Sequence, residues 1–238
     1  MATAMILAAG RGERMRPLSD AIPKPLLPLS GKPLIVWQIE ALARADFTEI
    51  VINVAWLGGR IREALGDGAA LGVRIAWSVE AEALETAGGI ATALPLLPAG
   101  PVAVVSGDVW TRYDYAKLHA TMARMAAGGT DRAHLVMVPN PPYHPEGDFA
   151  LAGGRIAGEE APRLTFGNIA IYDTALFGEL PRGVKLKLLP LFRQWIGNGI
   201  VSGERFDGAW ANVGTPQELA DLDRRLREGR AGDGAADD

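Results

Sequence analysis

The chain has 238 residues, 48% of them apolar, a formal net charge of −4 and no cysteine. This composition excludes disulfides, thiolate metal sites and a cysteine nucleophile, and without a basic run it argues against nucleic acid or an anionic membrane as a partner. No apolar stretch approaches the roughly 20 residues of a membrane-spanning helix, and no basic segment precedes the first apolar run as it would in a signal peptide. We therefore expect a cytoplasmic enzyme.

Strand-like and helical patterns alternate through the first half of the chain. This alternation predicts an α/β fold in which a mostly parallel sheet carries helices on both faces. We place the strands at 4–8, 49–55, 73–79 and 101–106. We place the helices at 33–45, at 57–65, from near Gly88 to just before Pro95, and at 113–127.

The second half mixes strands and helices less regularly. Its predicted elements are a strand at 133–138, a hairpin at 149–157 that turns at Gly153 and Gly154, a strand at 165–172, and a helix at 185–197 interrupted near Pro190. No internal repeat and no long linker divides the chain, so we expect a single domain over residues 1–227.

The last helix has a clear predicted start. Thr215 is a good capping residue, Pro216 fits the first helical position, and Glu218 stands three residues after the cap. After Arg227 the sequence is rich in glycine and charge, and we expect residues 228–238 to be a disordered tail.

The first apolar run ends at Leu7 and opens into a glycine-rich turn with several arginines. Such turns bind phosphates, because glycine lets the backbone approach the ligand, exposed N–H groups form an anion nest, and arginine adds charge-assisted hydrogen bonds. No Gly-Lys-Ser/Thr follows, and Met15 replaces the third glycine of the dinucleotide fingerprint, so the turn is neither of those motifs. On its own it also fits an ordinary strand-to-helix loop.

A rigid lysine strengthens the functional interpretation of this turn. Lys24 lies between Pro23 and Pro25, which fix the backbone and favour an extended, non-helical conformation. The alternative is a solvated surface lysine in a proline-rich loop. The chain has few lysines and many arginines, and a lysine held rigidly just after a phosphate-type turn favours a functional role.

Together, L-A-A-G-x-G-x-R-M-x-P-L and P-K-P-L-x-P resemble the signature of the sugar-1-phosphate nucleotidylyltransferases. Further matching stretches at 84–90, 106–110, 147–149 and 210–215 extend the resemblance over residues 4 to about 225. Within the family, the motifs and the short length are most similar to the members that attach UMP to N-acetylmuramic acid α-1-phosphate in bacterial peptidoglycan recycling.

The resemblance implies a Rossmann-like three-layer nucleotide-diphospho-sugar transferase fold. Its nucleotide-binding half covers about 1–110 and its sugar-binding half about 111–227. The implied reaction joins UTP and a sugar 1-phosphate into a UDP-sugar and pyrophosphate with Mg²⁺ as cofactor, in a monomer or small homo-oligomer. Two alternatives stay open: a thymidylyl- or guanylyltransferase for glucose, mannose or heptose 1-phosphate, and a degenerate nucleotide-sugar-binding regulatory protein.

The resemblance also implies catalytic roles for Lys24, Arg16 and Asp108. Asp108 follows a predicted buried strand, and ligands of open α/β sheets bind beyond the carboxyl ends of the strands. The family places a metal-binding aspartate there, although a helix cap is the alternative. Asn212 stands where the family has its second metal aspartate, and its amide oxygen brings no charge. This difference allows three outcomes: weaker metal binding, metal binding that depends mainly on Asp108 and the substrate phosphates, or lost activity. We expect an active enzyme.

Substrate-binding residues follow from the same resemblance. The predicted nucleotide contacts are Leu7, Ala8, Ala9, Gly10, Arg11, Gly12, Glu13, Lys24, Glu80, Glu85, Gly88 and Asp108. The predicted contacts to the sugar phosphate are Asp148, Glu159, Asn168 and Lys187, with Lys185 as an alternative to Lys187. Thr86 as a helix cap and Asp148 at a hairpin entry are the structural alternatives. His119, His134 and His144 show no metal-binding spacing, and we expect them to be structural.

Overall fold

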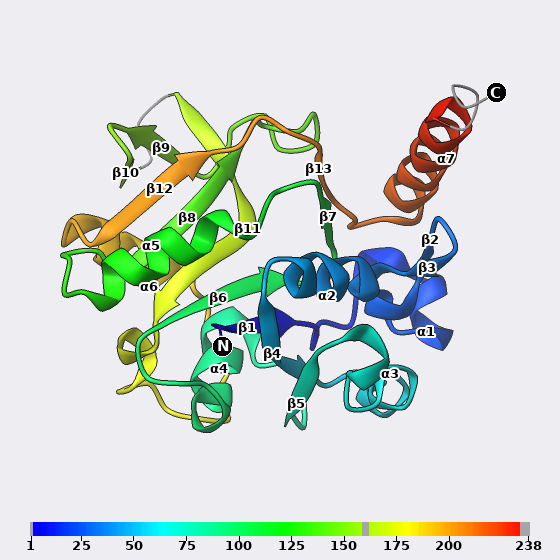
Figure 1. The fold of residues 1–238 in the computed structure, drawn as a ribbon, viewed down its shortest axis with the longest axis horizontal. Helices are drawn as coiled ribbons and strands as arrows, with labels where there is room; N and C mark the ends of the chain where they lie inside the picture. The colour runs from blue at the N-terminus through cyan, green and yellow to red at the C-terminus, as the bar shows by residue number, and fades with distance from the viewer. Residues whose placement is uncertain (1, 159–161, 234–238) are drawn as a thin grey trace.

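A single twisted sheet forms the centre of the molecule (Figure 1). The computed structural model describes residues 2–158 and 162–233. Within them the sheet contains nine strands in the order β5 (Arg74–Val79), β4 (Phe47–Val54), β1 (Ala2–Leu7), β6 (Pro101–Ser106), β11 (Arg163–Asp173), β8 (Ala133–Val138), β12 (Val201–Arg205), β10 (Arg155–Ala157) and β9 (Phe149–Ala152).

The strand directions confirm the predicted mixed, largely parallel sheet. Strands β5, β4, β1 and β6 are parallel neighbours, and β8 pairs in parallel with β12. Strand β11 runs antiparallel to both β6 and β8 and joins these two parallel groups. The predicted hairpin is formed by β9 and β10, with Gly153 and Gly154 both at positive φ in its turn.

Helices cover both faces of the sheet and make the three predicted layers. On one face lie α2 (Leu34–Arg44), α3 (Gly58–Leu65) and α5 (Lys117–Ala126), and on the other lie α4 (Glu85–Ala93) and α6 (Leu189–Gly197). Strand β1 shows the reason: Ala4 and Ile6 join the first apolar core, while Met5 between them joins the second. Side chains of a strand alternate between faces, so an unbroken apolar run requires cover on both.

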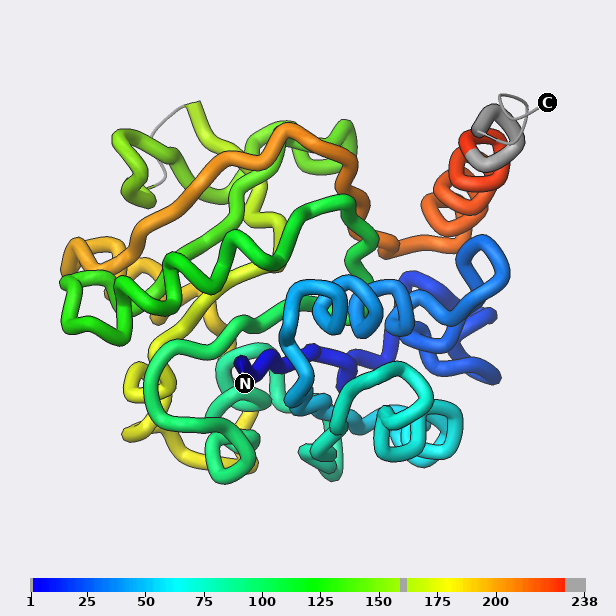
Figure 2. The backbone as a smooth tube through the Cα atoms, viewed as in Figure 1, coloured from blue at the N-terminus to red at the C-terminus, as the bar shows by residue number. Residues whose placement is uncertain are grey.

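The C-terminal helix α7 (Pro216–Asp233) stands apart from the sheet, beside the short hairpin of β2 (Pro28–Leu29) and β3 (Lys32–Pro33) (Figure 2). Its predicted start is confirmed: the Thr215 hydroxyl accepts from the backbone N–H of Glu218 at 3.2 Å, and the Glu218 carboxylate accepts from the N–H of Thr215 at 2.9 Å. Leu219 and Leu222 bury this helix against a third, smaller apolar cluster.

Three predicted helix boundaries are wrong by four residues or more. Helix α7 continues past Arg227 to Asp233, because single glycines only weaken a helix; residues 234–238 lie outside the described residues. The helix predicted at 185–197 begins only at Leu189, because Pro190 fits the first turn and not a helix interior. The helix predicted at 113–127 begins at Lys117, after the buried Tyr115. In the described residues no helix is both long and apolar enough to cross a bilayer.

A small two-stranded sheet and several short helical segments complete the described fold. Strand β7 (Val109–Thr111) pairs antiparallel with β13 (Trp210–Asn212), which brings the C-terminal part of the chain back to the end of β6. Helix α1 (Leu18–Ala21) follows the glycine-rich turn. The sequence patterns predicted neither these elements nor β12.

His134 is a buried histidine in the central sheet. It lies in β8 with 5% of its surface exposed, and its Nδ1 is 3.0 Å from the hydroxyl of Ser202. Burial lowers the pKa of His134, and the nearby Glu204 and Asp131 only partly oppose this effect. The neutral imidazole is therefore the form that the folded chain favours.

We expect the free energy of unfolding to fall as the pH drops below about 6.5, because the unfolded chain then binds a proton that the folded chain disfavours. His134→Gln should make this decline shallower in urea titrations at pH 7.5, 6.5 and 5.5. Equal slopes for the wild type and the variant would contradict this assignment.

Candidate active site

The glycine-rich turn after β1 and the Asp108 segment after β6 meet where the strand order of the sheet reverses. The chain runs from β1 outward through β4 and β5 and then returns to add β6 on the other side of β1. Leu7 and Ser106, the last residues of β1 and β6, are register partners, and the N–H of Gly107 donates to the carbonyl of Leu7 at 2.9 Å. Ligands of open α/β sheets bind at such a reversal, beyond the carboxyl ends of the strands.

A cavity of about 380 Å³ opens at this point, and we call it the first cavity. Its wall contains many of the predicted nucleotide contacts: Leu7, Ala8, Ala9, Gly10, Gly12, Lys24, Glu85 and Asp108. The predicted residues Arg11, Glu13, Arg16, Glu80 and Gly88 are not on the wall. The rest of the wall consists of Pro25, Asn53, Ser106, Gly107 and the 83–86 segment, which includes Thr86.

Lys24 and Asp108 form the charged pair of this cavity. Lys24 Nζ lies 2.5 Å from Asp108 Oδ2, and only 9% of the lysine surface is exposed. Gly12 explains how the lysine is held: its φ is 69°, and a Cβ there would lie 3.1 Å from Lys24 Cβ. Only glycine combines this left-handed conformation with such a close approach. The glycine-rich turn therefore packs directly on the lysine side chain.

Asn53, at the end of β4, is a site residue that the sequence did not reveal. Its Oδ1 accepts from the N–H of Ala8 at 2.9 Å, and its Nδ2 donates to Glu80 Oε1 at 2.7 Å. Glu80 Oε2 in turn accepts from the N–H of Leu84 at 3.1 Å. This buried relay joins the phosphate turn to the 83–86 segment, so Glu80 lies behind the wall. Burial raises the pKa of Glu80, and the hydrogen bonds from Asn53 and Leu84 oppose this.

Gly88 and Gly89 lie where close packing leaves no room for a side chain, which the sequence did not show. A Cβ at Gly88 would lie 2.1 Å from the carbonyl oxygen of Val184, and the N–H of Gly88 already donates to Leu186 at 3.2 Å. A Cβ at Gly89 would lie 2.7 Å from Asn53 Nδ2. In this structure Gly88 therefore admits the 183–188 segment, where we had expected contact with the nucleotide.

The pairing of β7 with β13 brings the backbone of Asn212 beside that of Asp108, while Asn212 itself lines a different cavity from Asp108, one that also contains Tyr143 and Glu218. The N–H of Val213 donates to the backbone carbonyl of Asp108 at 2.9 Å, and Asn212 pairs with Val109. Asn212 Oδ1 is buried and has no hydrogen-bond partner. A buried oxygen without a partner is costly and needs an explanation, and a bound cation supplies one. Among the described residues no cluster of three or more histidine, cysteine or acidic side chains competes as a metal site.

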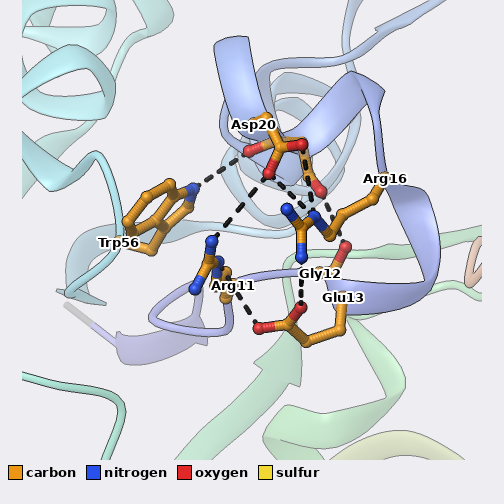
Figure 3. Close-up of polar contacts among 7 residues, drawn as sticks. Arg11, Gly12, Glu13, Arg16, Asp20 and Trp56 are labelled. Atoms are coloured by element: carbon orange, nitrogen blue, oxygen red, sulfur yellow. Dashed lines mark hydrogen bonds and ion pairs between the residues drawn. The ribbon is translucent and has the colours of Figure 1, made fainter.

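Two arginines of the phosphate turn, Arg11 and Arg16, share the carboxylates of Glu13 and Asp20, and the third, Arg14, turns away from them. Arg16 Nε lies 3.0 Å from Asp20, and Arg11 lies between Glu13 and Asp20, at 3.4 and 3.9 Å (Figure 3). Neither arginine lines the first cavity. Arg14, which sequence reasoning passed over, turns toward β13. A Cβ at Gly214 would lie 2.9 Å from Arg14 Nη2.

A second cavity of about 270 Å³ adjoins the first, and the two share Leu7, Thr86 and Ser106. The predicted sugar contacts Asp148 and Asn168 line it, together with apolar side chains such as Phe166 and Phe192. The pairing of β11 with β8 is irregular between Phe166 and Ala170, and Asn168 has a positive φ of 55°. Such irregularities re-aim side chains at functional sites.

Asp148 has two polar partners near the second cavity, while Lys185 and Lys187 do not line it. Asp148 Oδ2 accepts from the N–H of Phe166 at 2.7 Å, and its Oδ1 is 3.2 Å from His144, which therefore belongs to this region. Lys187 is exposed and not on the cavity wall, while Lys185 pairs with Glu82 at 2.5 Å. Glu159 lies outside the described residues.

A glycine-rich phosphate turn packed on a lysine, with a carboxylate at the strand-order reversal, is the site expected of a nucleotidyl transferase. The family described as nucleotidyl transferase matches residues 3–144, and the chain belongs to this family. The resemblance found from the motifs is thereby confirmed.

Two relatives cover nearly the whole chain. The chain is 50% identical over 216 residues to an N-acetylmuramate alpha-1-phosphate uridylyltransferase of Neisseria meningitidis serogroup B, across 89% of this chain and 93% of the relative. It is 36% identical to a protein of the same description from Caulobacter vibrioides, across 94% of this chain and 97% of that one.

Solved structures confirm the predicted fold class. A putative glucose-1-phosphate thymidylyltransferase from Bacillus anthracis superposes with a TM-score of 0.83 at 20% identity, covering 95% of this chain and 96% of that one. HddC from Yersinia pseudotuberculosis, complexed with GMP-PN, gives a TM-score of 0.77 at 20% identity, covering 95% of this chain and all of that one.

Asn53 gives the site a direct test. We expect Asn53→Ala to lower the free energy of unfolding by roughly 1–3 kcal/mol, because it leaves the buried Ala8 N–H and Glu80 without their partner. It should also weaken nucleotide binding, since the phosphate turn loses its link to β4. Urea unfolding and calorimetric titration with UTP measure the two effects. Unchanged values in both would show that the relay is unimportant.

Proposed function

We propose that this protein transfers UMP from UTP to N-acetylmuramic acid α-1-phosphate and releases pyrophosphate, a step of peptidoglycan recycling in the cytoplasm. The observation that carries the proposal is the Lys24–Asp108 pair, held at 2.5 Å inside the phosphate turn at the strand-order reversal. The 50% identity to a relative described by this activity, over most of both chains, supports the choice of base and sugar.

The division into two adjoining cavities supports a reaction with two substrates. We place the nucleoside triphosphate in the first cavity and the sugar 1-phosphate in the second. Leu7, Thr86 and Ser106 line both, so the reacting phosphates would meet at their boundary. The apolar wall around Phe166 and Phe192, with the polar groups of Asp148 and Asn168, suits a sugar ring.

The residues around Asp108 fit a divalent cation, and we infer Mg²⁺. Asp108 offers a carboxylate, and Asn212 Oδ1 is a buried oxygen with no other partner. Mg²⁺ prefers oxygen ligands, often one or two protein groups completed by substrate phosphates. When bound, the cation would neutralise negative charge on the phosphates and so help pyrophosphate to leave.

The side chains need little covalent chemistry to perform this transfer. The sugar phosphate is already an anionic nucleophile; its oxygen forms a bond to the α-phosphorus while the bond to the bridging oxygen breaks, and the electron pair leaves with pyrophosphate. The barrier is mainly charge repulsion and misalignment. Lys24 would bring a fixed positive charge to the α-phosphate. Among the arginines, Arg14 lies against Gly214, just after β13, whereas Arg16 pairs with Asp20.

The test is pyrophosphate release from the purified protein with Mg²⁺. Each of UTP, dTTP, GTP, CTP and ATP is offered with a panel of sugar 1-phosphates that includes N-acetylmuramic acid α-1-phosphate. We expect turnover with UTP and the N-acetylmuramate compound. Turnover with another pair would overturn the proposed specificity. Tight nucleotide binding without any turnover would contradict the proposed enzyme activity and favour a nucleotide-binding protein.

Lys24 distinguishes catalysis from binding alone. We expect Lys24→Ala to lower kcat about 10²- to 10³-fold, because a fixed charge that stabilises the transition state is lost. Lys24→Arg keeps the charge and controls for the loss of the ion pair, and thermal melting checks that both variants fold. A variant that loses only affinity for UTP, with kcat intact, would contradict this role.

Asn212 tests the inferred cation site. We expect Asn212→Asp to lower the Mg²⁺ concentration for half-maximal rate, because hard cations favour a charged carboxylate, and Asn212→Leu to raise it. Titration of the rate with Mg²⁺ at saturating substrates measures both. If the two variants have the same Mg²⁺ dependence as the wild type, Asn212 is not a ligand.

A further inference from the structure

Trp56 is an aromatic residue next to the phosphate turn, although it does not line the first cavity. The guanidinium carbon of Arg11 lies 4.3 Å from the centroid of the Trp56 ring, which is cation–π distance (Figure 3). The indole N–H of Trp56 donates to the carbonyl of Ser19 at 3.0 Å. The hydroxyl of Ser19 donates to the carbonyl of Gly12 at 2.8 Å. Trp56 therefore contacts the turn directly through Arg11 and indirectly through Ser19.

The carboxylates around Arg11 hold it only weakly. Glu13 and Asp20 lie 3.4 and 3.9 Å from its nitrogens, and the side chains involved are 40–62% exposed. Exposed ion pairs of this kind contribute little, because water screens them and both side chains lose freedom. A nucleoside triphosphate carries more negative charge than either carboxylate and offers oxygens that suit a guanidinium. A bound triphosphate would therefore replace Glu13 and Asp20 as the partner of Arg11.

The stacking contact can persist through that exchange. A guanidinium uses its face against an aromatic ring and its N–H edge for oxygen acceptors, so the two interactions do not compete. Gly10 and Gly12, the neighbours of Arg11 in the chain, both line the first cavity. The N–H edge of Arg11 therefore needs only a local change of partner to reach a phosphate at the cavity rim.

We propose that Trp56 is a positioning residue for nucleotide binding: it holds Arg11 beside the phosphate turn, where Arg11 exchanges Asp20 and Glu13 for the phosphates of the nucleoside triphosphate. This inference rests on the proposed function for the identity of the ligand. Trp56 acts through Arg11 and touches no substrate itself.

The first experiment is a double-mutant cycle on Trp56 and Arg11, read by calorimetric titration with UTP and by KM. We expect Trp56→Leu to weaken UTP binding about tenfold, with Trp56→Phe in between because it keeps an aromatic face. In an Arg11→Ala background, Trp56→Leu should change the affinity less than about twofold. KM for the sugar phosphate should stay unchanged in every variant. Additive losses, or an unchanged affinity in Trp56→Leu, would overturn the proposal.

Trp77 provides a matched control. It is also a half-buried tryptophan whose indole N–H donates to a backbone carbonyl, that of Gly66 at 3.1 Å, but it lies in the edge strand β5. Trp77→Leu removes the same groups and should leave the affinity for UTP unchanged. An equal loss in Trp77→Leu would show a general effect on stability and contradict a specific role for Trp56.

Asp20→Asn gives a second readout, which works even if Trp56→Leu does not fold. If Asp20 competes with the triphosphate for Arg11, its neutralisation should tighten UTP binding about threefold. A purely structural Asp20 predicts weaker binding, which would contradict the exchange. The titration needs no sugar substrate, so a failure of this inference is distinct from a failure of the proposed transfer, where UTP binds and nothing turns over.

Discussion

The positive charge of Lys24 lies against the carboxylate of Asp108, with 2.5 Å between nitrogen and oxygen and little of the lysine exposed. Removing one partner of a well-buried pair leaves an uncompensated charge, at a cost of roughly 3–5 kcal/mol when burial is complete. The surroundings are arranged to bring these two groups together. Lys24 lies in a rigid proline frame under Gly12, and Asp108 follows β6 beside the carboxyl end of β1. In this structure Lys24 and Asp108 neutralise each other, and a bound nucleotide would bring its phosphates to Lys24 in place of Asp108.

A relay of hydrogen bonds keeps this arrangement in register across three neighbouring strands. Asn53 at the end of β4 links the turn after β1 to Glu80, just after β5, and Glu80 links to the 83–86 segment. The 183–188 segment then packs on Gly88, where its backbone leaves no room for a side chain. Helix α6 follows this segment and lines the second cavity through Phe192. A continuous set of contacts therefore connects the first cavity to the second.

The sequence was most informative where chemistry depends on neighbours in the chain. The glycine-rich turn, the proline-framed Lys24 and the strand-end Asp108 were predicted because each follows from a local pattern. Asn53 was missed because its role depends on two partners, Ala8 and Glu80, that only the folded sheet brings together. Gly88 was predicted as a nucleotide contact, and no local pattern shows the approach of Val184. The direction of Arg14 and Arg16 likewise depends on a turn whose geometry the motif does not specify.

The central claim is that Lys24, Asp108 and Asn212 form one phosphate- and metal-binding site. A crystal structure with Mg²⁺ and a non-hydrolysable UTP analogue tests it most directly. We expect oxygens of Asp108 and Asn212 at about 2.1 Å from the cation, and Lys24 bound to the α-phosphate. A nucleotide bound away from Lys24, or a cation that leaves Asn212 without a partner, would contradict the claim.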